Sequence, residues 1–347
     1  MLAAALGQFT AGVRHASLPA DVAAAVKLRI LDTLGAGLAG VQLGNHRAVL
    51  ALLESGRASA HVWGEAVTAT AREAALLNSF ATHSTYLEDG SRYTGGHPSS
   101  VVIPAALAEA EVLQRSGADL IAAVAAGYEV FLRLGRAIYP ATVVRGFQST
   151  AVLGAVSSAA AVASLRRLSA EATSHAISIG ANLGVGMKEA LKCSESQPIQ
   201  VARSCEGGII AAKLAQQGLP GAPEIFEKGF LPAFAAAVDA SSILAGLGSR
   251  YRIGETYLKR HAGCRGNHAP LDAALEIFAA ERIEPARVHR VRVKVDTVTR
   301  AASQNGRSRR RTSRKNSSRS PRPGWVTRPA RCATRCSASK RLPTWQR

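Results

Sequence analysis

The sequence predicts a mostly α protein, made of a large all-helical domain followed by an incomplete small α+β lid domain. Apolar residues make up 47% of the 347 residues and aromatic residues only 5%. Because Ala, Val and Leu dominate the apolar set, this composition favours closely packed helices over a β-sandwich. We expect a helical domain over residues 1–248, a partial lid domain over 249–299 and a basic tail over 300–347.

Most of residues 1–245 shows apolar residues at helical spacing, with Gly or Pro at the joins. The first long helix is expected to follow Pro19 and to end in the glycine-rich stretch 35–40. A short strand is expected at 59–63. Further helices are expected at 68–86, 98–115, 118–138, 149–167, 170–180 and 201–217.

An uncharged run over residues 146–165 is long enough to span a bilayer. It consists mostly of Ala, Ser, Gly and Thr, which drive membrane insertion poorly, so we expect a buried helix and no membrane partner. The first residues lack the basic region of a secretory signal. The scattered Cys193, Cys205 and Cys264 indicate free thiols in a reducing compartment, so we expect a cytoplasmic protein.

A different pattern begins near residue 250. A short amphipathic helix is predicted around residues 271–278, and a strand over 288–298, where Val291, Val293 and Val295 alternate with charged residues. A single strand cannot bury its apolar face without partner strands, and the following sequence supplies none. We therefore expect the chain from about residue 250 onward to be loosely attached.

The charge is concentrated in the last part of the chain. Residues 300–347 hold 15 of the 43 Lys and Arg residues and none of the 24 acidic ones. Their Arg/Ser-rich composition has too few apolar residues to fold. Residues 300–347 have three possible interpretations: a basic arm for nucleic acid, an inert tail, or the product of a frameshift. The abrupt compositional break favours the frameshift, and nucleic acid is disfavoured because the body shows no basic-aromatic surface.

The strongest candidate for chemistry lies between two predicted helices, over residues 86–100. Pro98 keeps His97 out of the helical conformation and places it beside the free N–H groups of the next helix. Such groups attract a carboxylate and keep a neighbouring imidazole neutral. His97 is then a candidate general base, with Asp89 orienting it or acting as a second acid or base. Arg92 is a candidate clamp for a carboxylate. The alternative is an ordinary helix start with Asp89 in an Asx turn.

Two further polar segments stand out. Residues 188–203 are expected to form a loop that leads into a helix, with Gln197 before a proline. Spacing alone favours a solvated loop with ordinary surface charges over a functional site. Residues 259–272 contain His261, Cys264 and His268 in an H-x2-C-x3-H pattern. Zinc would need a fourth ligand, so anion binding by this basic stretch is favoured over zinc.

Other motifs are missing from the sequence, which contains no phosphate-binding loop, dinucleotide fingerprint, nucleophile elbow or zinc-protease motif. We accordingly expect no cofactor and no metal. The remaining histidines of the body are interpreted as surface or helix-packing residues: His15, His46, His61, His83 and His175.

Six segments in this order resemble the MmgE/PrpD family, whose members include 2-methylcitrate dehydratase. They are LRILDTLGAGLAG at 28–40, the LEDG to GGHPSS segment at 87–100, GFQSTAVLGAVSSAAA at 146–161, SQPIQVARSCEGGIIAA at 196–212, GFLPAF at 229–234 and KRHAGCRGNHAPLDA at 259–273. The resemblance covers residues 5–298. It implies a helical domain, a smaller α+β lid, a site between them and a homodimer. The family's lid has more strands, so the resemblance also implies a truncated or frameshifted member.

The resemblance implies catalytic roles for three residues, Asp89 and His97 as the acid/base pair and His268 as a proton donor or carboxylate contact from the lid. Two positions depart from the family pattern, because many members have histidine where this chain has Gln148 and lysine where it has Gln197. The substrate-binding residues implied with them are Arg92, Tyr93, Gln148, Gln197, Lys259, Arg260 and Cys264.

The function expected is that of a metal-independent lyase acting on a small polycarboxylate, with a 2-methylcitrate-like dehydratase favoured. A proton next to a carboxylate would be removed and water lost. Alternatives left open are a decarboxylase or epimerase of the same family, an inactive truncated remnant, and, distantly, nucleic-acid binding through the tail.

The hypothesis that residues 300–347 do not fold makes a direct prediction. Because residues 300–347 have no periodic apolar face and no acidic partners for their positive charges, limited trypsin digestion should cut there first and leave a fragment ending near Arg300. Mass spectrometry of the digest checks this, and a tail that resists the protease in the free protein would contradict it.

Overall fold

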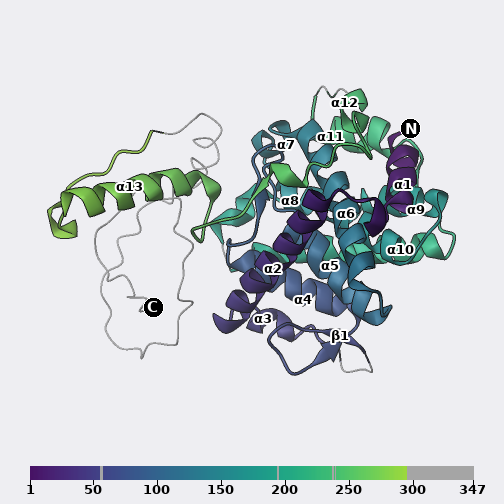
Figure 1. Ribbon diagram of the computed structural model, residues 1–347, viewed down its shortest axis with the longest axis horizontal. Helices are drawn as coiled ribbons and strands as arrows, with labels where there is room; N and C mark the ends of the chain where they lie inside the picture. Colours follow the sequence, from purple (N-terminus) through teal and green to yellow (C-terminus); the bar gives the residue numbers. More distant parts are fainter. Residues whose placement is uncertain (55–57, 194, 237, 239, 295–347) are drawn as a thin grey trace.

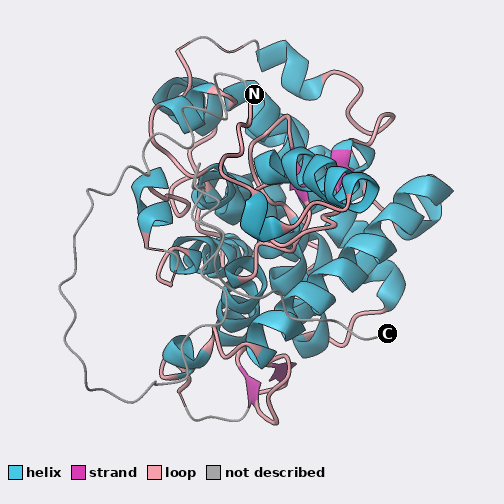
Figure 2. Ribbon diagram, turned by 90° about the vertical axis from the view of Figure 1, so that its left-hand side faces the viewer, coloured by secondary structure: helices cyan, strands magenta, loops and turns pink. Residues whose placement is uncertain are grey.

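The computed structural model describes residues 1–54, 58–193, 195–236, 238 and 240–294 (Figure 1). Within these residues helices dominate and the strands are two residues each, so the predicted mostly α class is confirmed (Figure 2). The helices are α1 (Leu2–Gly12), α2 (Ala20–Gln42), α3 (Arg47–Leu50), α4 (Ala71–Ser84), α5 (Ser99–Val112), α6 (Gly117–Ile138), α7 (Ala141–Val144), α8 (Ser149–Leu165), α9 (Ala170–Gly180), α10 (Pro198–Gln216), α11 (Leu231–Phe234), α12 (Ala240–Leu244) and α13 (His268–Glu281). The strands form two antiparallel pairs, β1 (Ala60–His61) with β2 (Thr68–Ala69), and β3 (Gly90–Ser91) with β4 (Thr256–Tyr257).

Helix α8 lies at the centre of the helical body and packs against α5, α6, α9 and α10. All of its residues except Ser164 are buried. Its small side chains let the neighbouring helices approach closely, which confirms the interpretation of residues 146–165 as a buried helix. No helix in the described part of the chain is long and apolar enough to cross a membrane.

Helix α2 continues through the glycine-rich stretch that was expected to end it. The reason is packing against α4, because a Cβ at Gly40 would lie 2.1 Å from the carbonyl oxygen of Ala81. A Cβ at Gly37 would lie 2.6 Å from the Trp63 ring. These glycines lie inside a helix and allow a second helix to approach closely. The sequence pattern alone does not distinguish them from glycines that end a helix.

A buried ion pair ties the chain after α12 to the helical body. Arg133 on α6 contacts Glu129 at 2.8 Å and donates hydrogen bonds to carbonyl oxygens of the loop over residues 243–250. Glu129 also accepts a hydrogen bond from the backbone N–H of Arg252. These contacts fix the direction in which the chain leaves the body.

Residues 251–263 return to the helical body and reach the segment that holds His97. Arg29 on α2 donates hydrogen bonds to the side chain and carbonyl oxygen of Thr256, at 3.1 and 3.0 Å. Strand β4 then pairs with β3, which immediately precedes the His97 segment. The expectation of loose attachment from residue 250 onward is therefore wrong for residues 251–263.

Helix α13 projects to one side of the helical body (Figure 1). Its residues Leu271 and Leu275 are exposed, at 42% and 57%. The strand predicted over 288–298 is not formed in its described part, since residues 288–294 have no regular structure and Val291 and Val293 are exposed. Alternation alone does not make a strand where a partner strand is lacking in the described residues. Val295, the rest of that strand and the whole tail lie outside the described residues.

The close approach of α2 and α4 gives a stability prediction with an internal control. Gly40→Ala should lower the free energy of unfolding by about 1–3 kcal/mol, because its Cβ would meet backbone atoms. In the same helix, a Cβ at Gly35 would meet no described atom within 4 Å. Gly35→Ala should therefore raise stability by up to about 1 kcal/mol. Urea denaturation checks both, and equal effects of the two substitutions would contradict the packing argument.

Candidate active site

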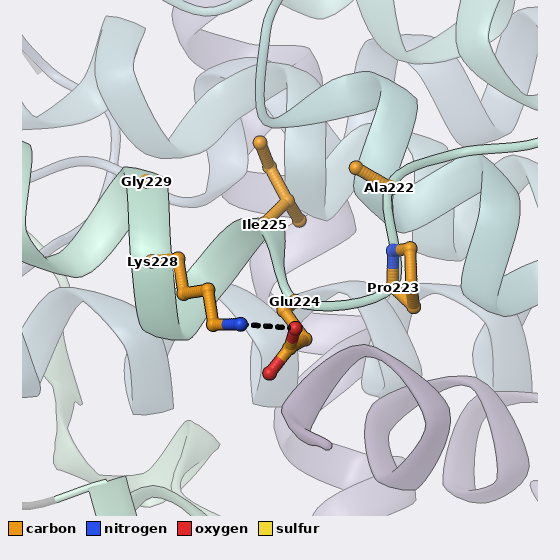
Figure 3. A pocket seen from close by; sticks show the side chains of 6 residues that line it. All are labelled: Ala222, Pro223, Glu224, Ile225, Lys228 and Gly229. Carbon is orange, nitrogen blue, oxygen red and sulfur yellow. Dashed lines mark hydrogen bonds and ion pairs between the residues drawn. The ribbon is translucent and has the colours of Figure 1, made fainter.

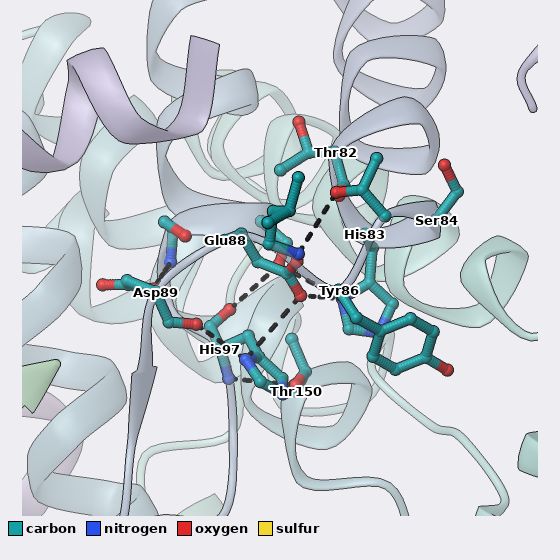
Figure 4. Close-up of polar contacts among 12 residues, drawn as sticks. Thr82, His83, Ser84, Tyr86, Glu88, Asp89, His97 and Thr150 are labelled. Atoms are coloured by element: carbon teal, nitrogen blue, oxygen red, sulfur yellow. Dashed lines mark hydrogen bonds and ion pairs between the residues drawn. The ribbon is translucent and has the colours of Figure 1, made fainter. Parts of the chain in front are cut away.

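His97 lies between β3 and α5, in a short segment that is held at both ends. Its backbone N–H donates to Thr150 Oγ1 at 3.1 Å, and Pro98 caps α5 directly after it. Its Nδ1 lies 2.7 Å from the carbonyl oxygen of Asp89 (Figure 4). A carbonyl oxygen only accepts hydrogen bonds, so Nδ1 carries the proton and Nε2 carries the lone pair. Nε2 makes no hydrogen bond to any described residue, and 18% of the side chain is exposed.

The surroundings of His97 keep its ring neutral. Burial, followed by the charge of Lys259, lowers the pKa of His97 to about 3, although Glu88 acts in the opposite direction. A neutral imidazole with a free Nε2 is the form that accepts a proton. The segment thus presents a neutral imidazole rather than a cation.

Glu88 is a buried carboxylate between two imidazoles. Its Oε1 lies 2.9 Å from His83 Nδ1 and 3.7 Å from His97 Nδ1 (Figure 4). Burial by itself would raise the pKa of Glu88, but the charge of Lys259, followed by the contacts with His83 and His97, lowers it to about 2. The site therefore holds a fixed negative charge behind the base.

A chain of side-chain hydrogen bonds runs from Ser100 through His83 to the entrance of α10. His83 Nδ1 lies 3.3 Å from the Ser100 hydroxyl oxygen, and with its proton on that side the ring accepts at Nε2 from the Gln197 amide nitrogen, at 3.2 Å. The Gln197 amide oxygen in turn accepts from the Tyr86 hydroxyl at 2.9 Å. Every donor in this chain meets an acceptor, so the orientation of the buried Gln197 amide is determined.

The predicted pairing of the Asp89 carboxylate with His97 is not what the structure shows. Oδ1 of Asp89 accepts from the backbone N–H of Ser99 at 3.1 Å, and Oδ2 accepts from the Tyr128 hydroxyl at 3.0 Å. It is the Asp89 carbonyl oxygen that orients His97. Burial raises the pKa of Asp89, opposed by the hydrogen bonds from Ser99 and Tyr128. The carboxylate thus holds the start of α5 in place.

The segment after β4 carries a cation, Lys259, and a further imidazole, His268. Lys259 Nζ donates to the carbonyl oxygen of Tyr86 at 2.7 Å, and its charge acts on Glu88, His97 and His268. His268 opens α13, is 4% exposed, and its buried Nε2 has no hydrogen-bond partner in the described structure. Burial, then the charge of Arg265, lowers its pKa.

The other predicted binding residues are spread more widely. Arg92 and Tyr93 lie on an exposed turn, where the Arg136 guanidinium stacks on the Tyr93 ring at 4.6 Å. Arg260 is exposed near Asp272, and Cys264 is an exposed free thiol. Gln148 is buried and caps α8 by accepting from the backbone N–H of Ala151 at 2.6 Å.

Two acidic or basic groups of the site escaped the sequence analysis. His83 was interpreted as a surface or helix-packing residue, but it is buried against Glu88. The signal available was its position in the last turn of α4, five residues before Glu88. Asp32 on α2 is the second, and burial and the charges of Asp89 and Glu88 raise its pKa to about 6.

Metal ligation finds no support in the described residues. They contain no group of three or more His, Cys, Asp or Glu side chains placed to hold a metal ion. His261, part of the zinc alternative, instead lies 2.7 Å from Asp272 and packs against the His268 ring.

A surface hollow of about 350 Å³ lies elsewhere, between Ala222 and Gly229 (Figure 3). Its charged groups, Glu224 and Lys228, pair with each other at 2.5 Å. None of the predicted site residues lines it, so it is not the candidate site.

The neutral state of His97 predicts a pH effect on stability. Unfolded His97 takes up a proton below its ordinary pKa of 6.5, whereas the folded residue stays neutral down to about 3. Acidification from pH 6.5 to 4.5 should therefore destabilise the wild type relative to His97→Gln, by at most about 2.7 kcal/mol. Urea denaturation at both pH values checks this, with the exposed His15→Gln as control. Equal pH dependence in wild type and His97→Gln would contradict it.

Comparison of the sequence with known proteins identifies the family of the chain. Residues 4–242 match the model of the MmgE/PrpD N-terminal domain. A cis-aconitate decarboxylase-like protein, oryM, of Aspergillus oryzae is 26% identical over 301 residues, which cover 81% of this chain and 62% of that protein. Cis-aconitate decarboxylase of Aspergillus terreus is 27% identical over 74% of this chain and 56% of its own length. The Homo sapiens cis-aconitate decarboxylase is 32% identical over 59% of this chain and 44% of its own length.

The chain thus spans between 44% and 62% of the length of these relatives. The family match covers α1 through α10, including the whole segment that holds Glu88 and His97. On this match, the chain belongs to the MmgE/PrpD family.

Proposed function

We propose that the chain is a lyase-type enzyme for a small polycarboxylate, in which His97 Nε2 removes a proton from the carbon next to a carboxylate. One observation carries this proposal: Nδ1 of His97 donates to the Asp89 carbonyl oxygen at 2.7 Å, which leaves Nε2 unprotonated and free to accept. The relatives named as decarboxylases of cis-aconitate, a tricarboxylate, support the substrate class.

Charges around the base fit a carboxylate substrate. Lys259 on the segment after β4 supplies a cation whose influence reaches His97. Glu88 offsets that cation on the protein side. A substrate carboxylate near Lys259 would orient the adjacent C–H bond toward Nε2, and holding the two together lowers the barrier to proton transfer.

The favoured reaction is loss of water from a 2-methylcitrate-like hydroxy acid. The C–H electron pair forms the new double bond, the C–O bond breaks, and the hydroxyl leaves as water after receiving a proton. His268 and Asp32 are the candidate donors of that proton, since the pKa of Asp32 is raised to about 6. His97 ends the turnover protonated and returns its proton to water.

Decarboxylation is the second candidate, favoured by the printed names of the relatives. In that reaction a C–C bond breaks, CO2 leaves, and the electron pair stays on the remaining carbon, which takes a proton from Asp32 or His268. The buried Gln148 and Gln197 side chains are neutral amides and supply no charge for an anion. Anion binding in this reaction therefore depends on Lys259 rather than on these amides.

Substitution of His97 tests the proposal. His97→Ala should lower turnover by about 10²–10⁴-fold, because general bases contribute in this range. The far-UV circular dichroism should not change. Activity is followed on 2-methylcitrate, citrate and cis-aconitate by appearance of the unsaturated product and by CO2 release, with His15→Gln as the control.

The outcomes separate the candidates. Water loss without CO2 release identifies the dehydratase, and CO2 release identifies the decarboxylase. Wild-type turnover that His97→Ala leaves unchanged would remove His97 from the mechanism. A wild-type protein that neither turns over these acids nor exchanges their α-hydrogen with solvent deuterium would contradict the proposed function.

A further inference from the structure

Lys188 has a largely buried side chain and no counter-ion among the described residues. It is 8% exposed, and its ammonium forms no hydrogen bond or ion pair with any residue of the described structure. Its neighbour in the same short helix, Lys192, is exposed and pairs with Glu189. Burying an unpaired charge is costly, and burial accordingly lowers the pKa of Lys188. A folded protein rarely retains such a group unless a ligand supplies the missing anion.

The backbone places Lys188 beside Gln148. An antiparallel bridge joins Phe147 to Met187, flanked by hydrogen bonds from Gln148 N–H to the Gly186 oxygen and from Lys188 N–H to the Gly146 oxygen, both 2.8 Å. Side chains alternate across such a bridge, so Gln148 and Lys188 lie diagonally on one face, opposite that of Phe147 and Met187.

The Gln148 amide has a free donor on this face. Its oxygen is occupied by the backbone N–H of Ala151, whereas its nitrogen donates to no acceptor in the described residues. Two positions later, the Thr150 hydroxyl accepts from the backbone N–H of His97. The start of α8 therefore connects this pair of donors with the base.

Cys264 connects the same place with the segment after β4. Its sulfur lies within electrostatic range of Lys188, and also of Tyr86 and Tyr257. The Tyr86 carbonyl oxygen is held by Lys259. Lys188 thus approaches the site from the helical body, while Lys259 approaches it from the chain after β4.

We propose that Lys188 and the Gln148 amide form a second carboxylate subsite, which binds a carboxylate remote from the carbon that His97 deprotonates. This inference rests on the proposed function, because it assigns the subsite to the same polycarboxylate. A substrate with two or three carboxylates would bridge Lys188 and Lys259. The subsite therefore selects for a polycarboxylate over a monocarboxylate.

Binding of tricarballylate, an unreactive tricarboxylate, tests the subsite without requiring turnover. By calorimetry, Lys188→Met and Lys188→Gln should weaken its affinity at least about tenfold, because a hydrogen bond to a charged group is lost. Without ligand, Lys188→Met should melt at the same or a higher temperature than the wild type, since an unpaired buried charge is removed. Lys192→Gln is the matched control and should bind as the wild type does.

The results distinguish this inference from the proposed function. Wild-type binding that weakens in the Lys188 variants, with no turnover of 2-methylcitrate, citrate or cis-aconitate, supports the subsite and contradicts the function. Unchanged affinity in both Lys188 variants overturns the subsite whatever the turnover. A lower melting temperature of Lys188→Met with unchanged affinity assigns Lys188 a structural role, and a wild type that does not bind tricarballylate overturns the subsite as well.

Discussion

The hydrogen bond from His97 Nδ1 to the Asp89 carbonyl oxygen is the contact on which the site depends. It selects one tautomer and turns the free nitrogen of the ring away from the backbone that holds it. The bond requires the carbonyl of Asp89 to be fixed, and the pairing of β3 with β4 fixes it from one side. The Asp89 carboxylate, bound to Ser99 and Tyr128, fixes it from the other.

The electrostatics of the site follow from this arrangement. Glu88 is buried as an anion because His83, His97 and Lys259 surround it, and burial with Lys259 nearby keeps His97 neutral. Removing one partner of such a buried set costs more than the set contributes, since the remaining charge is left uncompensated. The helical body provides the neutral imidazole of His97 and the anion of Glu88, and the chain after β4 provides Lys259. A working site therefore needs residues 251–263 in place.

Local signals in the sequence predicted much of the fold and part of the site. Helical periodicity predicted the central helix α8, and Pro98 predicted where α5 begins beside His97. Residues 35–40 were misjudged because glycines that end a helix and glycines that let two helices approach have the same local pattern. The strand expected at 288–298 failed in its described part because strand formation depends on a distant partner. His83, Lys188 and Asp32 were missed because their burial is created by contacts between segments far apart in the chain.

The most direct test of this account is the tautomer and protonation of His97, read from ¹⁵N chemical shifts of the labelled imidazole. The account predicts a neutral ring with hydrogen on Nδ1 and a bare Nε2 at pH 6.5, and the same spectrum at pH 4.5, because the pKa is lowered to about 3. His97→Gln assigns the signal by its loss. A ring that titrates near its ordinary pKa of 6.5, or that carries its hydrogen on Nε2, would contradict the claim that this residue is poised as a base.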